Sequence, residues 1–379
     1  MNYSIQGIGA VTPLGPTALE TWTALCRGQQ APKTLFANGL SGRNYFCCRV
    51  PAKFIADAAR QPRLRRSGTI SLLGAAAGFD AFADAGLKPG SGLSTRIAVV
   101  FAICSGGVNY TRRFYHEIVT QGAHGASPLL FPETVYNAAA SHLAALLGVN
   151  GQSYTLVGDS SVGLAAIHFA IELLTMQRQL DRCLVVGTEE ADWLLADAFA
   201  CWRMATKRDQ FEVYGQSGGT IFGEAAAAIL IGRTGPLAIA SSSPGLPFHT
   251  FRESESAARE MFGPLQAGGS PEMIVSSANG TFADEVERKI FRELYPSVPV
   301  YAPKPALGEA LGASALLQVA IAGLALRHQQ LPGTLSAGSK LPNINRETRA
   351  CSSCRALVTS VGFNQQVNAL KLCLAQSPC

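Results

Sequence analysis

The sequence has little charge: Asp, Glu, Lys and Arg make up 15% of its 379 residues, whereas apolar residues make up 47%. A chain so poor in charge and so rich in apolar side chains is neither disordered nor a coiled coil. Its net charge of +5 is too small and too dispersed to indicate nucleic acid as the main partner. At roughly 150 residues per domain, the length predicts two or three structural units.

Long apolar runs are also lacking. The longest, Ile97–Cys104 and Ala225–Ile231, fall far short of the roughly 20 residues that span a bilayer. Met1–Pro13 has no basic stretch ahead of an apolar run, so it does not have the pattern of a signal peptide. We therefore expect no transmembrane helix and a cytoplasmic protein.

Recognisable cofactor motifs are missing as well. The cysteines are scattered except for Cys47-Cys48 and Cys351-x-x-Cys354, and a zinc ribbon needs a second pair at suitable spacing. The glycines of Gly215–Gly223 lack both the G-x-G-x-x-G spacing and a strand-to-helix context, and no P-loop signature is present. The sequence thus predicts no metal site and no other cofactor.

Short apolar runs alternate with longer segments of helical spacing in both halves of the chain. The expected strands are 5–11, 96–104, 182–187, 237–243, 273–277, 298–302 and 356–360, and the expected helices are 17–26, 69–85, 163–176, 284–295 and 312–327. Strands separated by helices predict a layered α/β architecture with parallel strands. Ser241–Ser270, rich in Ser, Pro, Gly and charge, is predicted to be a surface excursion.

Several segments carry a family resemblance, and they occur in order along the chain. They read GIGAVTPLG, FPETVYNAAASHLAALLG, GDSSVGLAAIHFAIELL, RCLVVGTEEAD, GGTIFGEAAAAILI, SSANGTFADEVE, KPALGEALGASALLQ and SVGFNQQVNALKL. Together they resemble the β-ketoacyl synthase branch of the thiolase-fold condensing enzymes, over essentially the whole chain. The resemblance implies a five-layered α/β/α/β/α fold of two similar halves, residues 1–233 and 234–379.

The catalytic positions that the resemblance implies are altered. The family uses a cysteine at the start of a buried helix, two histidines and a lysine; here the matching residues are Ser160, Asn279, Glu309 and the retained Lys304. A serine is a poor nucleophile without an adjacent base, and both candidate histidine bases are replaced. An ionised Glu309 places negative charge where an oxyanion would develop, unless it pairs with Lys304 as a buried ion pair. These changes argue against condensing activity by the chain alone.

Simpler interpretations of the same residues remain open. Ser160 and Ser161, with Asp159, have the residue types that cap a helix N-terminus. Asn279-Gly280 is a strong turn dipeptide. His168, on the apolar helix after Ser160, is expected to be a satisfied core histidine rather than a catalytic one.

Two further segments match functional parts of the family. Gly362-Phe363 resembles the start of its flexible gate loop, but Asn364 and the two following glutamines replace the glycines, so the gate should be stiffer. Phe363 either walls a pocket or is a plain core aromatic. The four arginines within seven residues are either a solvated face or a docking site for acidic acyl carrier protein: Arg60, Arg63, Arg65 and Arg66.

The altered catalytic positions and the family's tendency to dimerise predict a function. The resemblance favours a degenerate, chain-length-factor-type subunit that pairs with an active ketosynthase, shapes the acyl tunnel and works with an acyl carrier protein. Bacterial type II polyketide, polyene (including aryl-polyene) or fatty-acid-type chain elongation is the expected setting. Two alternatives are an active enzyme in which Ser160 performs acyl transfer or hydrolysis, and a homodimer that binds an acyl chain.

Overall fold

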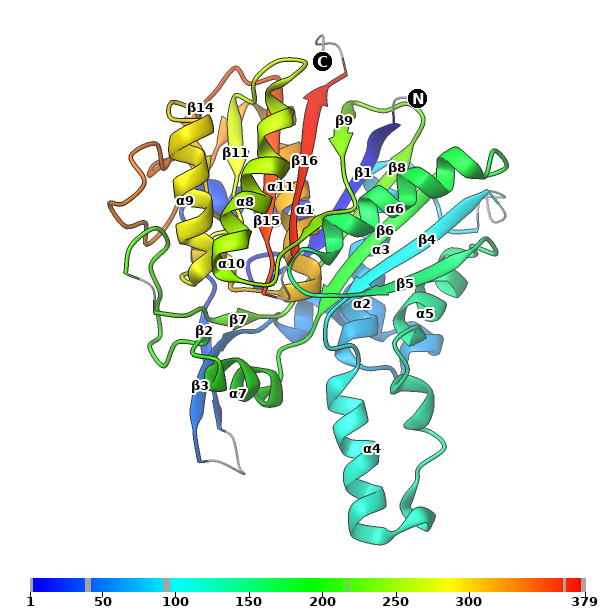
Figure 1. Cartoon of the computed structure of the whole chain (residues 1–379). Helices are drawn as coiled ribbons and strands as arrows, with labels where there is room; N and C mark the ends of the chain where they lie inside the picture. Colours follow the sequence, from blue (N-terminus) through cyan, green and yellow to red (C-terminus); the bar gives the residue numbers. More distant parts are fainter. Residues whose placement is uncertain (1–2, 38–41, 91–95, 217, 364–365, 376–379) are drawn as a thin grey trace.

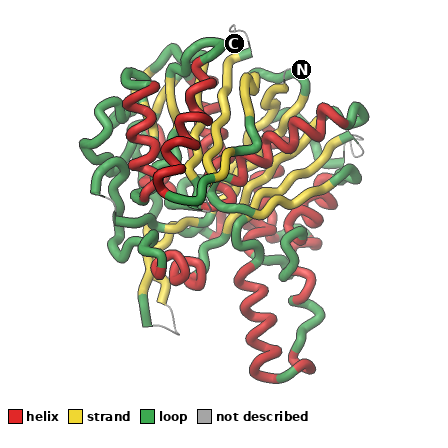
Figure 2. The backbone as a smooth tube through the Cα atoms, viewed as in Figure 1, coloured by secondary structure: helices red, strands yellow, loops and turns green. Residues whose placement is uncertain are grey.

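The computed structural model describes residues 3–37, 42–90, 96–216, 218–363 and 366–375, in which helices and strands alternate (Figure 1 and Figure 2). The strands are β1 (Tyr3–Val11), β2 (Lys33–Ala37), β3 (Asn44–Cys48), β4 (Ile97–Ile103), β5 (Ser153–Val157), β6 (Arg182–Glu189), β7 (Phe222–Gly223), β8 (Ala225–Gly232), β9 (Leu237–Ser242), β10 (Leu246–Pro247), β11 (Met273–Val275), β12 (Val300–Tyr301), β13 (Gln330–Leu331), β14 (Arg349–Ala350), β15 (Arg355–Val361) and β16 (Gln366–Leu374). The α-helices are α1 (Ala18–Cys26), α2 (Ala56–Ala59), α3 (Thr69–Asp84), α4 (Val108–Gln121), α5 (Ala138–Leu147), α6 (Val162–Met176), α7 (Trp193–Cys201), α8 (Phe251–Phe262), α9 (Phe282–Leu294), α10 (Lys304–Leu307) and α11 (Ser314–His328).

The main sheet consists of two wings that repeat one topology. Its strand order is β12-β11-β15-β16-β9-β1-β8-β6-β4-β5, with β10 attached to β16. From the outer edge to the centre, the strands are β5-β4-β6-β8-β1 in the first wing and β12-β11-β15-β16-β9 in the second. In both wings these are the third, second, fourth, fifth and first main-sheet strands of that half of the chain, when β10 is left out. The wings join where β1 pairs antiparallel with β9. This repeat is what two similar halves require, whereas the division between residues 233 and 234, in the connection from β8 to β9, stays a prediction.

The expected parallel pairing is correct for only part of the sheet. β4 is parallel to β5 and β6, and β11 is parallel to β12 and β15. By contrast, β8 and β16 run antiparallel to their neighbours. For β16 the reason is its short connection from β15, because parallel neighbours need a crossover of a dozen or more residues.

Helices cover the wings in layers. α6 and α11 contact each other and strands of both wings, so they form the central layer. α3 and α5 pack on the outer side of the first wing, and α8 and α9 on that of the second. The predicted five-layered α/β/α/β/α fold is therefore confirmed. The central layer is the most deeply enclosed, since every residue of α11 from Ser314 to Leu326 is buried.

One helical stretch, Leu311–His328, is long and apolar enough to cross a membrane by length and composition. In the structure, 89% of this stretch is buried inside the protein. Its apolar character therefore corresponds to its place between the two wings.

The interpretation of Ser241–Ser270 as a surface excursion is wrong. This range contains β10 and the amphipathic helix α8, whose apolar face buries Ala258, Met261 and Phe262 against the second wing. The spacing of these apolar residues follows the helical period. The polar residues between them, which suggested a loop, lie on the solvent side.

A hairpin based on α4 projects away from the body of the molecule (Figure 1). None of the helix's residues is buried. The projecting segment and its return, residues 108–137, expose large apolar side chains that a monomer normally covers: Tyr115, Val119, Leu129, Phe131, Val135 and Tyr136.

The base of this hairpin rests on a buried carboxyl group. Glu190 is 1% exposed, and it accepts a hydrogen bond from the backbone N–H of Asn109 in the first turn of α4 (3.1 Å). Its Oε2 has no partner among the described residues. Burial is the main cause that raises the pKa of Glu190 to about 7; hydrogen bonds from Asn109 lower it, and the nearby Glu224 and Asp192 add smaller upward contributions. Between about pH 4.5 and pH 7 the native state therefore holds a proton that the unfolded chain has lost.

We expect Glu190→Gln to flatten the pH dependence of stability. Because the pKa is higher in the folded state, Glu190 lowers the free energy of unfolding progressively as pH rises from about 4.5 to about 7. A neutral amide removes this loss. The change in the free energy of unfolding caused by the substitution should therefore be more favourable at about pH 8 than at about pH 4.5, by about 1–3 kcal/mol. Urea unfolding at both pH values measures the difference. The exposed Glu260→Gln is the matched control, and an unchanged profile in Glu190→Gln would contradict the prediction.

Candidate functional site

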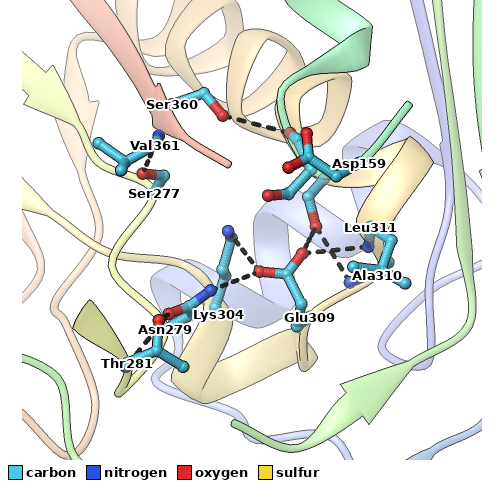
Figure 3. A network of polar contacts seen from close by, with 12 residues as sticks. Asp159, Ser277, Asn279, Thr281, Lys304, Glu309, Ala310, Leu311, Ser360 and Val361 are labelled. Atoms are coloured by element: carbon cyan, nitrogen blue, oxygen red, sulfur yellow. Dashed lines mark hydrogen bonds and ion pairs between the residues drawn. The ribbon is translucent and has the colours of Figure 1, made fainter. Parts of the chain in front are cut away.

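Glu309 lies at the centre of a closed polar network in the second half of the chain (Figure 3). Its Oε2 accepts hydrogen bonds from Lys304 Nζ (2.6 Å) and Asn279 Nδ2 (2.8 Å). Its Oε1 accepts from the backbone N–H of Leu311 (3.0 Å) and from Ser314 Oγ (2.5 Å). The carboxylate thus has four donors, which use the roughly four lone-pair directions that a carboxylate offers.

The predicted ion pair between Lys304 and Glu309 is confirmed. Their side chains are 3% and 0% exposed, so the pair is fully desolvated. Such a pair is tolerated because its members compensate each other's charge and are further hydrogen-bonded.

Asn279 serves both as a turn residue and as a network member. Its Oδ1 accepts from the backbone N–H (3.2 Å) and the hydroxyl (2.6 Å) of Thr281 at the start of α9, while its Nδ2 donates to Glu309. Gly280 has φ +82°, and a Cβ there would lie 2.9 Å from the carbonyl oxygen of Gly219. The two interpretations of Asn279-Gly280 therefore apply together.

Two acidic residues of α9 that were not expected at the site, Asp284 and Glu287, bind the backbone beside Asn279. Asp284 accepts from the backbone N–H of Asn279 (2.7 Å), and Glu287 accepts from the N–H (3.0 Å) and hydroxyl (2.8 Å) of Ser277. Burial raises the pKa of Asp284 to about 7. Their spacing of three residues puts both on the same helix face as the apolar Ile290, and this pattern could have identified them from the sequence.

Ser160 lies between β5 and α6 and is fully buried. Its hydroxyl has no hydrogen-bond partner among the described residues. Its backbone carbonyl accepts from Ser360 Oγ (3.2 Å) on β15, so the first half of the chain meets the second here. In the part of the chain that the structure describes, no group is therefore hydrogen-bonded to this hydroxyl to take its proton.

Asp159 holds the turn that precedes α6. Its Oδ1 accepts from the backbone N–H (3.0 Å) and the hydroxyl (2.9 Å) of Ser161. Ser161 Oγ also donates to Gln366 Oε1 (3.0 Å) at the start of β16. No side chain of the described residues makes a capping hydrogen bond to the N–H groups of α6, so the capping interpretation is wrong for Ser160 and Ser161, and Asp159 instead binds the N-cap residue Ser161.

Phe363 combines its two predicted roles. Its ring packs against Phe199 of α7 (centroids 5.1 Å apart) and Phe282 of α9 (6.5 Å). It also lines an apolar pocket of about 580 Å³ that extends to Asp159. Asn364, predicted to stiffen the gate, lies outside the described residues.

The four clustered arginines are all exposed, on the segment before α3. Arg60 pairs with Asp57 (2.6 Å), and the backbone carbonyl of Arg66 accepts from the hydroxyl of Tyr110 (2.9 Å) on the projecting hairpin. The cluster thus adjoins the hairpin but lies apart from the Glu309 network. Its role in docking stays a prediction.

The histidine predicted for the core lies at its margin. His168 Nδ1 lies 3.2 Å from Ser242 Oγ on β9, so the ring has a partner as expected, but the residue is only half-buried. In the part of the chain that the structure describes, no group of three or more His, Cys, Asp or Glu side chains could hold a metal ion.

Comparison with known proteins gives matches over the whole length. The family model for the N-terminal domain of β-ketoacyl synthase matches residues 4–235. A 3-oxoacyl-[acyl-carrier-protein] synthase 2 of Coxiella burnetii is 24% identical, over 95% of each chain. The tetracenomycin polyketide synthase ketoacyl synthase beta subunit of Streptomyces glaucescens is 25% identical, over 90% of this chain and 89% of the relative. A solved ketosynthase in complex with its chain length factor, from Xenorhabdus doucetiae, matches with a TM-score of 0.81 at 20% identity, over 99% of this chain and 98% of that one.

Proposed function

Because this chain belongs to the β-ketoacyl synthase family, we propose that it is a catalytically inactive, chain-length-factor-type subunit that pairs with an active ketosynthase and shapes its acyl tunnel. The observation that carries the proposal is the closed network around Glu309. A fold of this family is present, while the side chains at three of the matched catalytic positions, Asn279, Lys304 and Glu309, bind one another.

The proposed loss of chemistry rests on one missing contact and two that are present. The Ser160 hydroxyl has no hydrogen-bond partner among the described residues, Asn279 donates to Glu309, and Lys304 compensates the Glu309 charge. Condensation needs a nucleophile that can be deprotonated and donors free to bind an oxyanion. The same burial of the Ser160 hydroxyl counts against the alternative in which it performs acyl transfer.

Two neighbouring surfaces suit a partner synthase. β5 is the edge strand of the first wing, and Val157 at its end is more than half exposed. The projecting hairpin adds the exposed rings of Phe131 and Tyr136. An unpaired strand edge beside apolar side chains is a surface that proteins normally cover.

The names of the relatives support a setting in polyketide-type assembly. The Streptomyces relative is a beta subunit of a ketoacyl synthase, and the Xenorhabdus structure pairs a ketosynthase with a chain length factor. We place the present chain in a bacterial type II polyketide or polyene system, the aryl-polyene type included. The exposed arginines from Arg60 to Arg66 would face the acidic carrier protein.

The test is co-expression with a catalytically intact ketosynthase from the same organism. The two chains should purify as a one-to-one complex on sizing. The chain alone should form no ketoacyl product from malonyl and acyl carriers, and mass spectrometry should find no acyl group on Ser160. A complex that never forms, or turnover by the isolated chain well above background, would sink the proposal; a stable acyl-binding homodimer would replace it in the first case.

A further inference from the structure

The apolar pocket beside Asp159 has an aromatic wall. Phe199 stands between Trp202 (ring centroids 5.3 Å apart) and Phe363 (5.1 Å), and all three line the pocket. The ring planes meet at 77° and 71°, so both edges and faces are turned toward neighbours. Aromatic walls of this kind interact favourably with other π-systems as well as with alkyl groups.

The rest of the lining is also poor in hydrogen-bond donors. The remaining described side chains are Val157, Leu195, Ala198, Met204, Cys104 and Asp159. Burial raises the pKa of the Cys104 thiol, which therefore stays neutral. Asp159 is an acceptor, and its Oδ1 is already engaged by Ser161. Among the described lining residues, the side-chain donors are the Trp202 indole and the weak Cys104 thiol.

The ring of Phe363 belongs to a longer row of aromatic contacts. Phe363 contacts Phe282, which follows Asn279 by three residues and in turn contacts Phe248 and Phe251 (6.3 and 6.0 Å). Among the described lining side chains, a guest in the pocket therefore meets mainly carbon and sulfur, with the Asp159 carboxylate and the Trp202 indole as the polar groups.

We propose that this pocket receives an unsaturated hydrocarbon acyl chain rather than a poly-β-keto chain. The inference rests on the proposed tunnel-shaping function and names the substrate class. A poly-β-keto chain carries a carbonyl on every second carbon, and burying each without a donor weakens binding about tenfold or more. A conjugated chain has no such groups and can lie against the rings of Phe199, Trp202 and Phe363.

The size and position of the pocket fit this guest. Its volume of about 580 Å³ is within the roughly 300–1,000 Å³ of small-molecule sites. Val157 and Trp202 at its rim are exposed, and Val157 ends the edge strand β5. A partner that covers β5 would enclose the chain between the two subunits.

The experiment uses parinaric acid, a fluorescent conjugated tetraene, with the purified complex and with this chain alone. We expect its fluorescence to rise on binding and Trp202 to be quenched by energy transfer, an effect that Trp202→Phe reduces without preventing binding. Ala198→Phe, which fills the pocket, should weaken binding at least about tenfold, whereas Met176→Phe on an exposed helix end should not.

Competition then distinguishes the chemical classes. Stearate should displace the tetraene less effectively than unlabelled tetraene does, and 12-oxostearate should be weaker than stearate by about tenfold. An oxostearate that competes as well as the tetraene, stearate that binds more tightly than the tetraene, or binding insensitive to Ala198→Phe would overturn the inference. Sizing of the same samples shows whether the complex forms, so failure of the substrate class is separated from failure of the proposed pairing.

Discussion

Glu309→Ala is expected to lower the free energy of unfolding by about 3–5 kcal/mol, because it leaves the Lys304 ammonium buried without a counter-charge. The same change removes the acceptor of Asn279 Nδ2 and of Ser314 Oγ. Unsatisfied buried donors add to the cost of an unpaired charge. Urea unfolding of the variant, compared with the parent chain, measures the effect.

Matched variants separate charge from packing. Lys304→Met alone should also be strongly destabilising, since it leaves the Glu309 carboxylate unpaired. The double variant Lys304→Met with Glu309→Gln removes both charges at similar volume, and it should be less destabilised than Glu309→Ala. A loss below about 1 kcal/mol in Glu309→Ala would contradict the assignment of the network as a stabilising replacement for the catalytic constellation.

Much of the fold could be predicted from the sequence, namely those elements whose local apolar pattern matches their burial in the folded protein. The apolar run from Ile97 to Ile103 forms β4, which is buried on both faces, and the helix predicted from Gly312 coincides with α11 in the central layer. The errors arose where burial is one-sided. α8 was missed because it carries all the charged residues of Ser241–Ser270, which made the range look like a surface loop.

Contacts within the candidate site could be predicted only between residues that are close to each other in the sequence. Lys304 and Glu309 are five residues apart across one short helical turn, so their pairing could be anticipated. The contact of Ser160 with Ser360 spans 200 residues and depends on how the two wings close on each other. The sequence predicts Ser314 only as part of an apolar helix. Its hydroxyl can donate to Glu309 because a backbone turn precedes α11.

The second large effect is expected at the projecting hairpin, which we propose binds the partner synthase. Phe131→Asp is expected to weaken association with the synthase at least about a hundredfold and to reduce product formation in proportion. The side chain is 56% exposed in the return segment of the hairpin, and its ring packs on Phe114 (5.7 Å). Loss of a central aromatic contact commonly costs 2 kcal/mol or more, and a carboxylate enclosed at an apolar interface adds its desolvation penalty.

Leu19→Asp on α1 is the matched control for Phe131→Asp, because Leu19 is also 56% exposed but belongs to a helix outside the hairpin and the edge strand. It introduces the same charge at a surface that the proposed pairing leaves in solvent, so association and product should stay close to those of the parent. Sizing and binding titration report association, and product assays of the reconstituted pair report turnover. If Phe131→Asp supported the parent rate at equal protein concentration, the hairpin would not be the surface through which this chain serves a synthase, and the edge strand β5 would have to hold the partner without it.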